Sequence, residues 1–385
     1  MGKRVLIGVT GGIAVYKVCD LIRDLKREGF EVRVIMTPFA ERFVGRLTFE
    51  TLTGNRVLTD WEGDPLAHIN LARWAEVFLI APCTVNTLSK VALGIGDNLL
   101  TTTVLAYDGP LLIAPASNTV MWKSPAVQEN LKRLKERGVI VIEPEWGVLA
   151  CEEEGEGKLA GRERIIDWIH YTLSPKRLKG RRVLITCGAT REPIDPVRFI
   201  SNSSSGEMGF SLARVMRWEG AEVKVIAGFT TAEEPPEVEI VRVRTHAEMR
   251  REVMKAFGDS DIVVMSAAVS DFRPRGVSTS KIKKGKDLLL ELEETEDILA
   301  ELGRMKGDRF LVGFALETEN LVENARKKLK EKNLDMIVAN PAEVIGSKHH
   351  RGYLITRTKQ EEFSFSTKLE SARFIVERII EAISS

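Results

Sequence analysis

The stretch RVLIGVTGG, residues 4–12, decides the fold of the N-terminal half of the chain. It is an apolar run of mostly branched residues that ends in a Thr-Gly-Gly loop. The next segment, IAVYKVCDLIRDLKREG (13–29), carries apolar residues at helical spacing, and a second apolar run, EVRVIMT (31–37), follows it. A strand, a glycine loop, a helix and a second strand in this order predict a doubly wound α/β sheet.

The same alternation continues beyond this first unit. Apolar runs predict further strands at 77–82, 111–116 and 138–144, and helical spacing predicts helices at 86–94, 97–107 and 124–137. Because these strands are continuously apolar rather than alternating, we expect a parallel sheet that is covered on both faces.

The pattern restarts at residue 182 with RVLITCGAT, a strand that runs into a second glycine loop. A serine-rich loop, a helix (208–220) and a strand (222–228) come next, and later apolar runs lie at 261–272, 310–317, 335–340, 351–357 and 361–366. The last two runs could form a terminal pair. A polar, basic segment with a proline places a linker at 172–181. The fold class is therefore α/β with two Rossmann-like domains, residues 1–171 and 182–385.

Composition excludes several classes of protein. The 385 residues are 44% hydrophobic and 29% charged, which suits a folded chain with a substantial core, and the net charge of +1 argues against nucleic-acid and membrane-surface binding. The N-terminal apolar run is too short for a signal peptide or a membrane span. Four cysteines without disulfide-like spacing indicate a reducing, cytoplasmic compartment.

Neither glycine loop is a G-x-G-x-x-G motif, and a doubly wound fold alone leaves reductase, transferase and ligase activities open. The loop FISNSSSGEMGF (199–210) is more specific. Hydroxyls and glycines ahead of a helix can form an anion site. They can equally form a surface turn that caps the helix, and the residues alone do not decide between the two.

Several stretches of the N-terminal half resemble the flavin-dependent cysteine decarboxylases. They are TGGIAVYK (10–17), VIMTPFA (34–40), HINLARWAEVFLIAPCTVNTLSKVALGIGDNLLTT (68–102), PASNTVMW (115–122) and LACEEEGEGKLA (149–160). In this family FMN oxidises a substrate that bears a C-terminal cysteine, and the oxidised substrate loses its carboxylate. The resemblance implies a flavodoxin-like decarboxylase fold, with Gly11, Gly12, Thr37, Thr84 and Asn86 around FMN. Helix capping is the structural alternative for Thr84 and Asn86.

Three residues have catalytic roles by this resemblance. His68, one of five histidines, matches the active-site histidine, an acid/base or an orienter of the thiol, although a lone histidine is more often structural. Asn118 matches the asparagine that holds the substrate carboxylate. Cys151 matches the flap thiol that assists reduction of the enethiol intermediate; without the resemblance it would be read as a half-buried free cysteine.

The match has departures in the flap region. Ser117 stands where the family has Met, Glu152 replaces a Gly, and Lys158 replaces an Arg, while Gly155 and Gly157 remain. These changes bear on the geometry of the flap rather than on the class of reaction.

The C-terminal half resembles the phosphopantothenate–cysteine ligase domain. The stretches are ITCGATREPIDPVRFISNSSSGEMG (185–209), SAAVSDFRP (266–274), KIKK (281–284), VGFALET (312–318) and ARKKLKEKNLDMIVAN (325–340). The family joins 4′-phosphopantothenate to cysteine through an acyl-nucleotide, usually with CTP and Mg²⁺. The resemblance leaves ATP possible in place of CTP, and it leaves the metal ligands unknown.

The ligase resemblance also assigns site residues. Asn202 matches the catalytic asparagine that holds the acyl-nucleotide, and Lys281 matches an essential lysine that neutralises growing charge. The substrate phosphate would lie on Ser203, Ser204, Ser205 and Gly206, and the nucleotide on Lys281 with Ala267, Asp271, Phe314, Lys328 and Lys332. Read without the family, Asp271 is a turn or cap residue near the end of a predicted strand, and the last two lysines form a solvated basic face of a helix.

Here too the chain departs from the family pattern. Ala189 replaces a Pro, Cys187 replaces a small residue before it, and Glu207 replaces a Lys after the serine loop. A carboxylate near a phosphate site is unfavourable, so we expect Glu207 to face solvent, where the helix dipole favours it.

Together the two resemblances predict a fused enzyme of coenzyme A biosynthesis, in which one domain makes the substrate of the other. Decarboxylases of this family form trimers and the ligase domains form dimers, so the resemblance implies a homo-oligomer that could be a dodecamer. Two alternatives remain: a regulatory binding relative without catalysis, and a flavin reductase with a nucleotide-binding second domain. No dinucleotide fingerprint favours the reductase.

Overall fold

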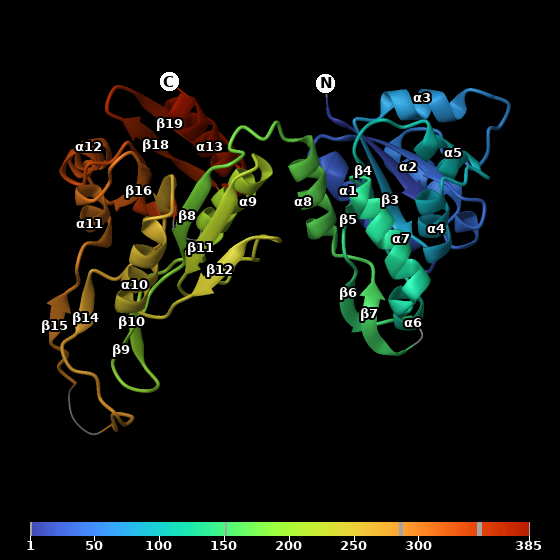
Figure 1. Cartoon of the computed structure of the whole chain (residues 1–385). Helices are drawn as coiled ribbons and strands as arrows, with labels where there is room; N and C mark the ends of the chain where they lie inside the picture. The colour runs from blue at the N-terminus through green and yellow to red at the C-terminus, as the bar shows by residue number, and fades with distance from the viewer. Residues whose placement is uncertain (1, 151, 285–287, 345–348, 385) are drawn as a thin grey trace. The chain divides into compact units, whose positions relative to one another are not determined.

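The computed structural model describes residues 2–150, 152–284, 288–344 and 349–384. The chain divides into two compact units, Met1–Leu173 and Ser174–Ser385 (Figure 1). The predicted linker at 172–181 covers the end of helix α8 (Arg162–Leu173) and the loop that leads to strand β8 (Arg182–Cys187).

The first unit is built on a five-stranded parallel sheet in the order β2-β1-β3-β4-β5. Its strands are β1 (Arg4–Val9), β2 (Glu31–Met36), β3 (Val77–Cys83), β4 (Leu111–Pro115) and β5 (Ile140–Val141). This is the flavodoxin-like strand order, and it reverses direction between β1 and β3. Ligands of open α/β sheets bind outside the carboxyl ends of the strands at such a switch point.

Helices cover both faces of this sheet, as the apolar strands predict. Val5 and Ile7 of β1 pack into one core cluster with α1 and α8, whereas Leu6 packs into a second cluster with α4, α5 and α7. The helices are α1 (Val15–Arg27), α2 (Arg46–Thr53), α3 (Ala67–Trp74), α4 (Val85–Leu93), α5 (Leu99–Leu105), α6 (Thr119–Lys123) and α7 (Pro125–Glu136), together with α8.

The second unit contains an eight-stranded sheet in the order β12-β11-β8-β13-β16-β17-β18-β19. The first six strands are parallel, and the predicted terminal pair β18–β19 is antiparallel. The strands after β8 are β11 (Glu222–Ala227), β12 (Glu239–Arg242), β13 (Ile262–Met265), β16 (Phe310–Glu317), β17 (Met336–Pro341), β18 (His350–Thr356) and β19 (Gln360–Phe365). This is the Rossmann order with two added strands, and its switch point lies between β8 and β13.

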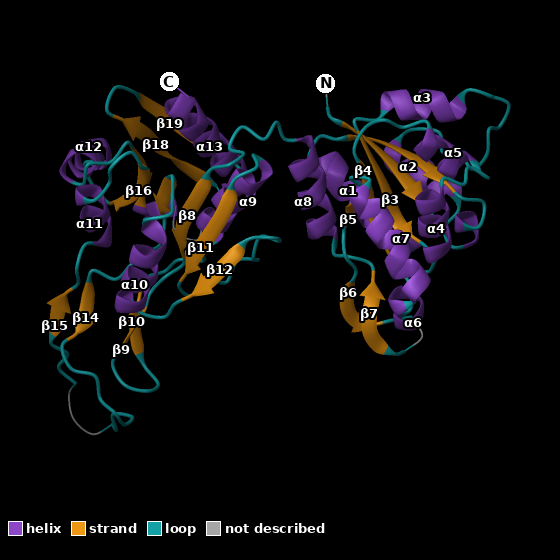
Figure 2. Ribbon diagram, viewed as in Figure 1, coloured by secondary structure: helices purple, strands orange, loops and turns teal. Residues whose placement is uncertain are grey.

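Five helices cover the second sheet: α9 (Glu207–Trp218), α10 (His246–Phe257), α11 (Ile298–Arg304), α12 (Leu321–Glu331) and α13 (Lys368–Ser384) among the described residues. Two small antiparallel ladders, β9 (Arg191–Pro193) with β10 (Phe199–Ser201) and β14 (Phe272–Pro274) with β15 (Leu292–Glu294), project beyond the main sheet (Figure 2). The prediction of two Rossmann-like domains is confirmed.

Two predicted strands are much shorter than expected. The run at 138–144 forms only β5, since Pro144 has no N–H to donate to a strand ladder. A hairpin of β6 (Glu145–Val148) and β7 (Glu154–Lys158) follows directly. The run at 261–272 forms a strand only to Met265. The Ser266 N–H still donates to Thr186 of β8, but Ala268 and Ser270 bond to Gly188 and Thr190, which lie in the loop after β8. No helix in the described parts of the chain is long and apolar enough to cross a membrane.

Candidate active sites

Thr10 joins two loops at the switch point of the first sheet. It follows β1 directly and is fully buried. Its Oγ1 donates to the Pro82 carbonyl at 2.7 Å and accepts from the Thr84 N–H at 2.8 Å. The loops after β1 and β3 are therefore fixed to each other at the edge where a flat ligand would bind.

The two glycines of the first loop have different environments. A Cβ on Gly11 would lie 2.5 Å from the ring of Phe39, so packing alone requires glycine there. A Cβ on Gly12 would meet only the Thr84 methyl group at 3.7 Å. The space beside Gly12 is thus open to a ligand, and Gly12 fits the predicted flavin contact better than Gly11 does.

The other predicted flavin residues lie at the same edge of the sheet. Thr84 is the N-cap of α4, where its Oγ1 accepts from the Thr87 N–H at 3.4 Å, so the capping role is present. Asn86 is exposed on the first turn of that helix. Thr37 is partly buried in the turn after β2, and its N–H donates to the Val9 carbonyl at 2.9 Å. Hydroxyl and amide groups therefore follow three neighbouring strands.

His68 is partly buried on the first turn of α3. Its Nδ1 accepts a hydrogen bond from Trp61 Nε1 at 3.4 Å, and the two rings meet edge to face with centroids 6.4 Å apart. Because Nδ1 is an acceptor in this contact, the proton of the neutral ring lies on Nε2. The arrangement leaves Nε2 for a substrate.

Asn118 follows β4 and is the N-cap of α6. Its Oδ1 accepts from the Met121 N–H at 2.8 Å. The amide oxygen is thereby occupied, and the two N–H groups of Nδ2 remain as donors, which is the polarity that a bound carboxylate needs.

The β6–β7 hairpin packs on α6 (Figure 1), whose N-cap is Asn118. The Ser117 N–H donates to the Gly157 carbonyl at 3.0 Å, and a Cβ on Gly157 would lie 2.3 Å from the Ser117 carbonyl oxygen. A Cβ on Gly155 would lie 2.1 Å from Thr119 Oγ1. Only glycine at both positions allows this approach. The predicted thiol, Cys151, lies outside the described residues.

Glu152 differs from the family pattern in a physically meaningful way. Its φ is +64°, in the left-handed region that favours glycine, and its N–H donates to the Leu149 carbonyl at 3.0 Å. The turn therefore keeps the backbone conformation of a glycine position although a side chain is present.

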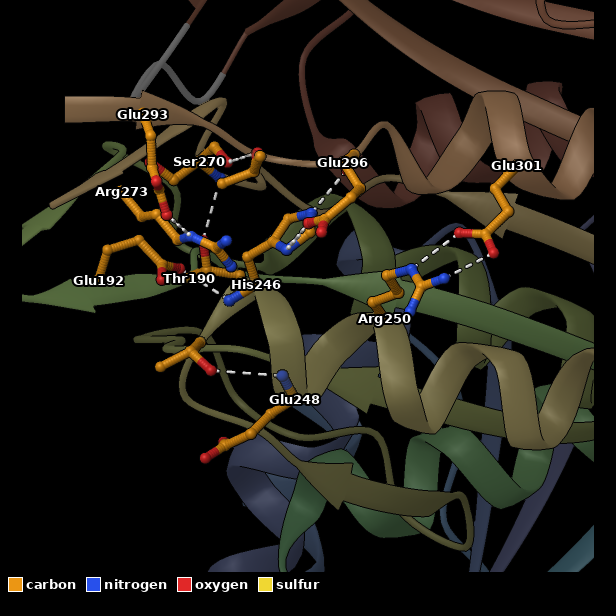
Figure 3. Close-up of polar contacts among 12 residues, drawn as sticks. Thr190, Glu192, His246, Glu248, Arg250, Ser270, Arg273, Glu293, Glu296 and Glu301 are labelled. Atoms are coloured by element: carbon orange, nitrogen blue, oxygen red, sulfur yellow. Dashed lines mark hydrogen bonds and ion pairs between the residues drawn. The ribbon is translucent and has the colours of Figure 1, made fainter. Parts of the chain in front are cut away.

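A buried threonine also organises the switch point of the second sheet. Thr190 Oγ1 accepts from the Ser270 N–H at 2.9 Å, and both residues are buried (Figure 3). The Ala268 N–H donates to the Gly188 carbonyl at 2.8 Å. These bonds hold the loops after β8 and β13 together.

A buried polar network extends from this point (Figure 3). The Glu192 carboxylate accepts from the His246 N–H at 2.7 Å, and His246 Nε2 lies 2.7 Å from the Glu296 carbonyl oxygen. His246 is 1% exposed. The network fixes the start of α10 to β9 and to the loop after β15. Our sequence reasoning missed Thr10, Thr190, Glu192 and His246, since a threonine after a strand and isolated polar residues carry no distinctive pattern.

The serine loop crosses the second switch point. The Asn202 Nδ2 donates to the carbonyls of Ala268 at 3.3 Å and Val269 at 3.1 Å, which leaves its Oδ1 as an acceptor. Gly206 has a φ of +80° and precedes α9. The Ser205 Oγ accepts from the Glu207 N–H at 3.3 Å. The loop therefore presents hydroxyls at a helix N-terminus, and one of them also caps that helix. It has features of both an anion site and a capping turn.

Ser203 is exposed, whereas Ser204 is partly buried and its Oγ accepts from the Gly206 N–H at 3.4 Å. Glu207 is exposed, as expected. It has a cationic neighbour in Lys368: burial lowers the pKa of the Lys368 ammonium, and the charge of Glu207 acts to raise it.

Ala267 and Asp271 lie in the loop after β13. The Ala267 N–H donates to Thr186 Oγ1 at 3.2 Å. Asp271 is exposed, and its carbonyl accepts from the Thr295 N–H at 2.9 Å. The prediction that Asp271 lies near the end of a strand is wrong, because that strand ends at Met265 and the loop bonds to Thr186, Gly188 and Thr190 instead.

The remaining predicted nucleotide residues are more dispersed. Lys281 is exposed on the segment before residues 285–287, and Phe314 is partly buried in β16, where it pairs with Val338 of β17. Lys328 forms an ion pair with Glu317 at 2.6 Å, and Lys332 forms one with Asp297 at 2.7 Å.

Helix α12 ends at Glu331, so Lys332 is its C-cap rather than an interior residue. The two lysines are thus paired with carboxylates on different elements instead of forming one solvated face. Binding of a triphosphate by these lysines would require them to exchange those partners.

The departures at 187 and 189 have local consequences. The Ala189 N–H donates to the Phe229 carbonyl at 3.0 Å, a bond that the family's proline could not make. Cys187 is buried, and burial raises the pKa of its thiol to about 12. A Cβ on Gly209 would lie 2.3 Å from the Cys187 Cβ, so α9 packs closely on β8 here.

Within the parts of the chain that the structure describes, no three His, Cys, Asp or Glu side chains form a group that could hold a metal ion. The described residues therefore assign no ligand set to the Mg²⁺ that the ligase resemblance implies.

Comparison with known proteins matches both halves of the chain. Residues 1–174 match the family "Flavoprotein", and residues 178–383 match the "DNA/pantothenate metabolism flavoprotein C-terminal domain". The chain is 45% identical over 356 residues to the coenzyme A biosynthesis bifunctional protein CoaBC of Bacillus subtilis, covering 90% of this chain and 87% of the relative. It is 39% identical to that of Borreliella burgdorferi, covering 97% and 98% respectively.

Solved structures match the two halves separately. The crystal structure of the C-terminal domain of a CoaBC protein covers 54% of this chain and 98% of its own, with 40% identity and a TM-score of 0.48. A PPC decarboxylase mutant complexed with pantothenoylaminoethenethiol covers 44% of this chain and 97% of its own, with 35% identity and a TM-score of 0.41.

Proposed function

The chain belongs to the family of coenzyme A biosynthesis bifunctional proteins, and we propose that it catalyses two consecutive reactions of that biosynthesis. The C-terminal unit joins 4′-phosphopantothenate to cysteine, and the N-terminal unit decarboxylates the product to 4′-phosphopantetheine. The observation that carries this proposal is that each unit has polar groups gathered at the switch point of a parallel sheet, on a chain similar to bifunctional relatives over both halves.

In the ligase reaction, a carboxylate oxygen of 4′-phosphopantothenate attacks the α-phosphate of CTP, and pyrophosphate leaves. The cysteine amine then attacks the acyl carbon and CMP leaves. Ser203, Ser204, Ser205 and Gly206 would donate to the substrate phosphate, because neutral donors at a helix N-terminus suit an anion. Lys281 would neutralise the charge that grows at the α-phosphate, and Mg²⁺ would be carried chiefly by the nucleotide phosphates.

Asn202 has a specific part in this scheme. Its Nδ2 is bonded to two carbonyls of the loop after β13, so Oδ1 is the atom left for a ligand. An acceptor at this position can take a proton-bearing group, such as the incoming amine, while the amide itself holds the serine loop in place.

The N-terminal edge fits FMN, because the side of the Gly12 loop is open and hydroxyl or amide groups follow three adjacent strands. Bound there, FMN would supply the two-electron oxidation of the cysteine moiety. Asn118 Nδ2 would hold the substrate carboxylate without an ion pair, so that the group can leave as CO₂. His68 Nε2 would orient the thiol or exchange its proton, with the ring held by Trp61.

We also propose a homo-oligomer. Large apolar side chains are exposed near the N-terminal site, including Ile13, Tyr16 and Phe39, and others are exposed on the β9–β10 and β14–β15 ladders, including Phe199 and Phe272. Apolar surface of this kind marks contacts between subunits. Decarboxylase trimers and ligase dimers together would give a dodecamer, and a monomer in analytical ultracentrifugation would rule this out.

A pair of variants tests the division of labour. His68→Asn should release pyrophosphate from 4′-phosphopantothenate, cysteine and CTP at the unaltered rate, keep its flavin and release no CO₂. Asn202→Asp should release neither product from these substrates but decarboxylate supplied 4′-phosphopantothenoylcysteine normally. His349→Asn, at an exposed histidine, is the control. Undiminished CO₂ release by the His68 variant would remove its assigned role.

A further inference from the structure

Asp195 is a buried carboxylate in the turn between β9 and β10. Its side chain is 0% exposed. Its Oδ1 accepts from the N–H groups of Val197 and Arg198, each at 2.8 Å. Its Oδ2 accepts from the Ile282 N–H at 3.2 Å and lies 3.6 Å from Arg198 Nη1. Both oxygens therefore have partners.

The contact with Ile282 joins two distant segments, because the two residues are 87 positions apart in sequence. Further bonds join the same segments. The Arg198 Nη2 donates to the Ile282 carbonyl at 2.8 Å, and the Ser278 N–H donates to the Ile194 carbonyl at 3.0 Å. The chain on the N-terminal side of residues 285–287 is thus held against the β9–β10 turn.

Each segment leads directly into the proposed ligase site. Ile282 is the neighbour of Lys281, the proposed catalytic lysine. The other segment continues through β10 into Asn202 and the serine loop. Asp195 is therefore bonded to the backbone of both segments. In the proposed ligase reaction, Asn202 on one segment and Lys281 on the other act on the same acyl-nucleotide.

The protonation state of Asp195 fits this arrangement. Burial acts to raise the pKa of the carboxyl group, but the N–H groups of Val197, Arg198 and Ile282, together with the Arg198 guanidinium, outweigh burial and lower it. Asp195 is consequently ionised at neutral pH, when both oxygens are acceptors.

We propose that Asp195 is a positioning residue of the ligase, which holds Lys281 in register with the serine loop through the Ile282 N–H. The proposal rests on the ligase function proposed above. Asp195 contacts no reacting atom in this scheme; it sets where the Lys281 ammonium can reach. Misplacing a catalytic group by about 1 Å can cost on the order of 100-fold in rate.

Asp195→Asn tests the proposal, because it keeps the shape of the side chain. It can place an amide N–H₂ group where the carboxylate oxygen Oδ2 now accepts from the Ile282 N–H and faces the Arg198 guanidinium. We expect pyrophosphate release to fall by about 10- to 100-fold, mainly in kcat. Decarboxylation of supplied 4′-phosphopantothenoylcysteine should be unchanged. Asp259→Asn, whose side chain is 83% exposed in the same unit, should match the unaltered enzyme.

A double-mutant cycle separates positioning from general destabilisation. If Asp195 acts through Lys281, then Asp195→Asn should cost less than about twofold in a Lys281→Gln background. Equal fold losses with and without Lys281 would overturn the proposal. If the Asn variant does not fold, Ile282→Pro removes the same N–H while leaving Asp195 intact, and it should show the same loss in kcat.

The ligase function and the positioning role of Asp195 fail on different results. Unaltered enzyme that releases no pyrophosphate would contradict the proposed function. Active enzyme in which both the Asp195→Asn and the Ile282→Pro variants match the Asp259→Asn control would contradict the positioning role alone.

Discussion

The Thr84 N–H donates a 2.8 Å hydrogen bond to Thr10 Oγ1, and this bond joins the loops after β1 and β3 at the switch point of the first sheet. The second sheet repeats the arrangement with different residues, since the Ser270 N–H donates to Thr190 Oγ1 at 2.9 Å. In both units the hydroxyl of a fully buried threonine, in the loop after the unit's first strand, accepts a hydrogen bond from a backbone N–H. That N–H belongs to the loop after the neighbouring strand across the switch point. The two halves therefore share a way of building their candidate sites.

Thr10→Val should weaken the N-terminal site selectively. The substitution leaves the Thr84 N–H without its acceptor, and an unsatisfied buried donor costs about 1–3 kcal/mol. We expect reduced FMN retention and slower CO₂ release, with pyrophosphate release unchanged. Flavin fluorescence titration measures the first effect, and Thr51→Val, at an exposed helical threonine, is the control. Equal flavin affinity in the two variants would contradict this account.

Trp61→Phe should loosen the His68 ring without removing an aromatic side chain. The indole N–H donates to His68 Nδ1, so its loss frees the ring to adopt the other tautomer. We expect CO₂ release to fall about tenfold, because an imidazole that orients a thiol or exchanges its proton must present the correct nitrogen. A rate of CO₂ release equal to that of the unaltered enzyme would show that the contact is only structural.

Gly157→Ala should displace the β6–β7 hairpin. The new methyl group would lie 2.3 Å from the Ser117 carbonyl oxygen, at a φ of +137° that disfavours any side chain. We expect a loss of CO₂ release of tenfold or more, on the order of 1.4 kcal/mol per factor of ten, with normal pyrophosphate release. Gly45→Ala, where nothing lies within 4 Å, is the matched control. Normal decarboxylation by the Gly157 variant would mean that the hairpin need not rest on Ser117.

His350 should make stability depend on pH. Burial, together with the charge of Lys368, lowers its pKa to about 3. Because the unfolded pKa is about 6.5, the unfolded state binds more protons than the folded state in between, and stability falls as the pH drops from about 6.5 toward 3. The loss between pH 7 and pH 5 is about 2 kcal/mol.

Urea unfolding of the His350→Phe variant at pH 5, 6 and 7 measures this contribution. Its stability should fall less steeply with acid than that of the His349→Gln control, whose histidine is exposed. Parallel slopes for the two variants would show that His350 is not the titrating group.

The strands of the first unit illustrate what the sequence could predict. Apolar runs such as 4–9 and 77–83 become buried strands because a parallel sheet buries both faces, so the pattern is local and strong. The end of β13 could not be predicted in this way. Residues 266–271 are apolar or small enough for a strand. Their backbone N–H groups instead donate to Thr186, Gly188 and Thr190, and the segment forms a loop.

The other features that could not be predicted from the sequence depend on contacts between residues far apart in the chain. Asp195 reads as a turn residue beside a proline, and only the fold brings Ile282 to it. Lys328 and Lys332 read as one helical face, but their ion pairs with Glu317 and Asp297 divide them. The roles of Asn118 and His68 came from resemblance, and the structure adds which of their atoms remain for a ligand.

A two-product assay shows whether one chain carries out both reactions. The unaltered, flavin-loaded protein would receive 4′-phosphopantothenate, cysteine and Mg²⁺ with CTP or ATP in turn, and pyrophosphate and CO₂ would be followed together. We expect both products in equal amounts, more of each with CTP than with ATP, and neither product without 4′-phosphopantothenate. Folded, flavin-loaded protein that yields neither product with either nucleotide would contradict it and favour a regulatory binding protein.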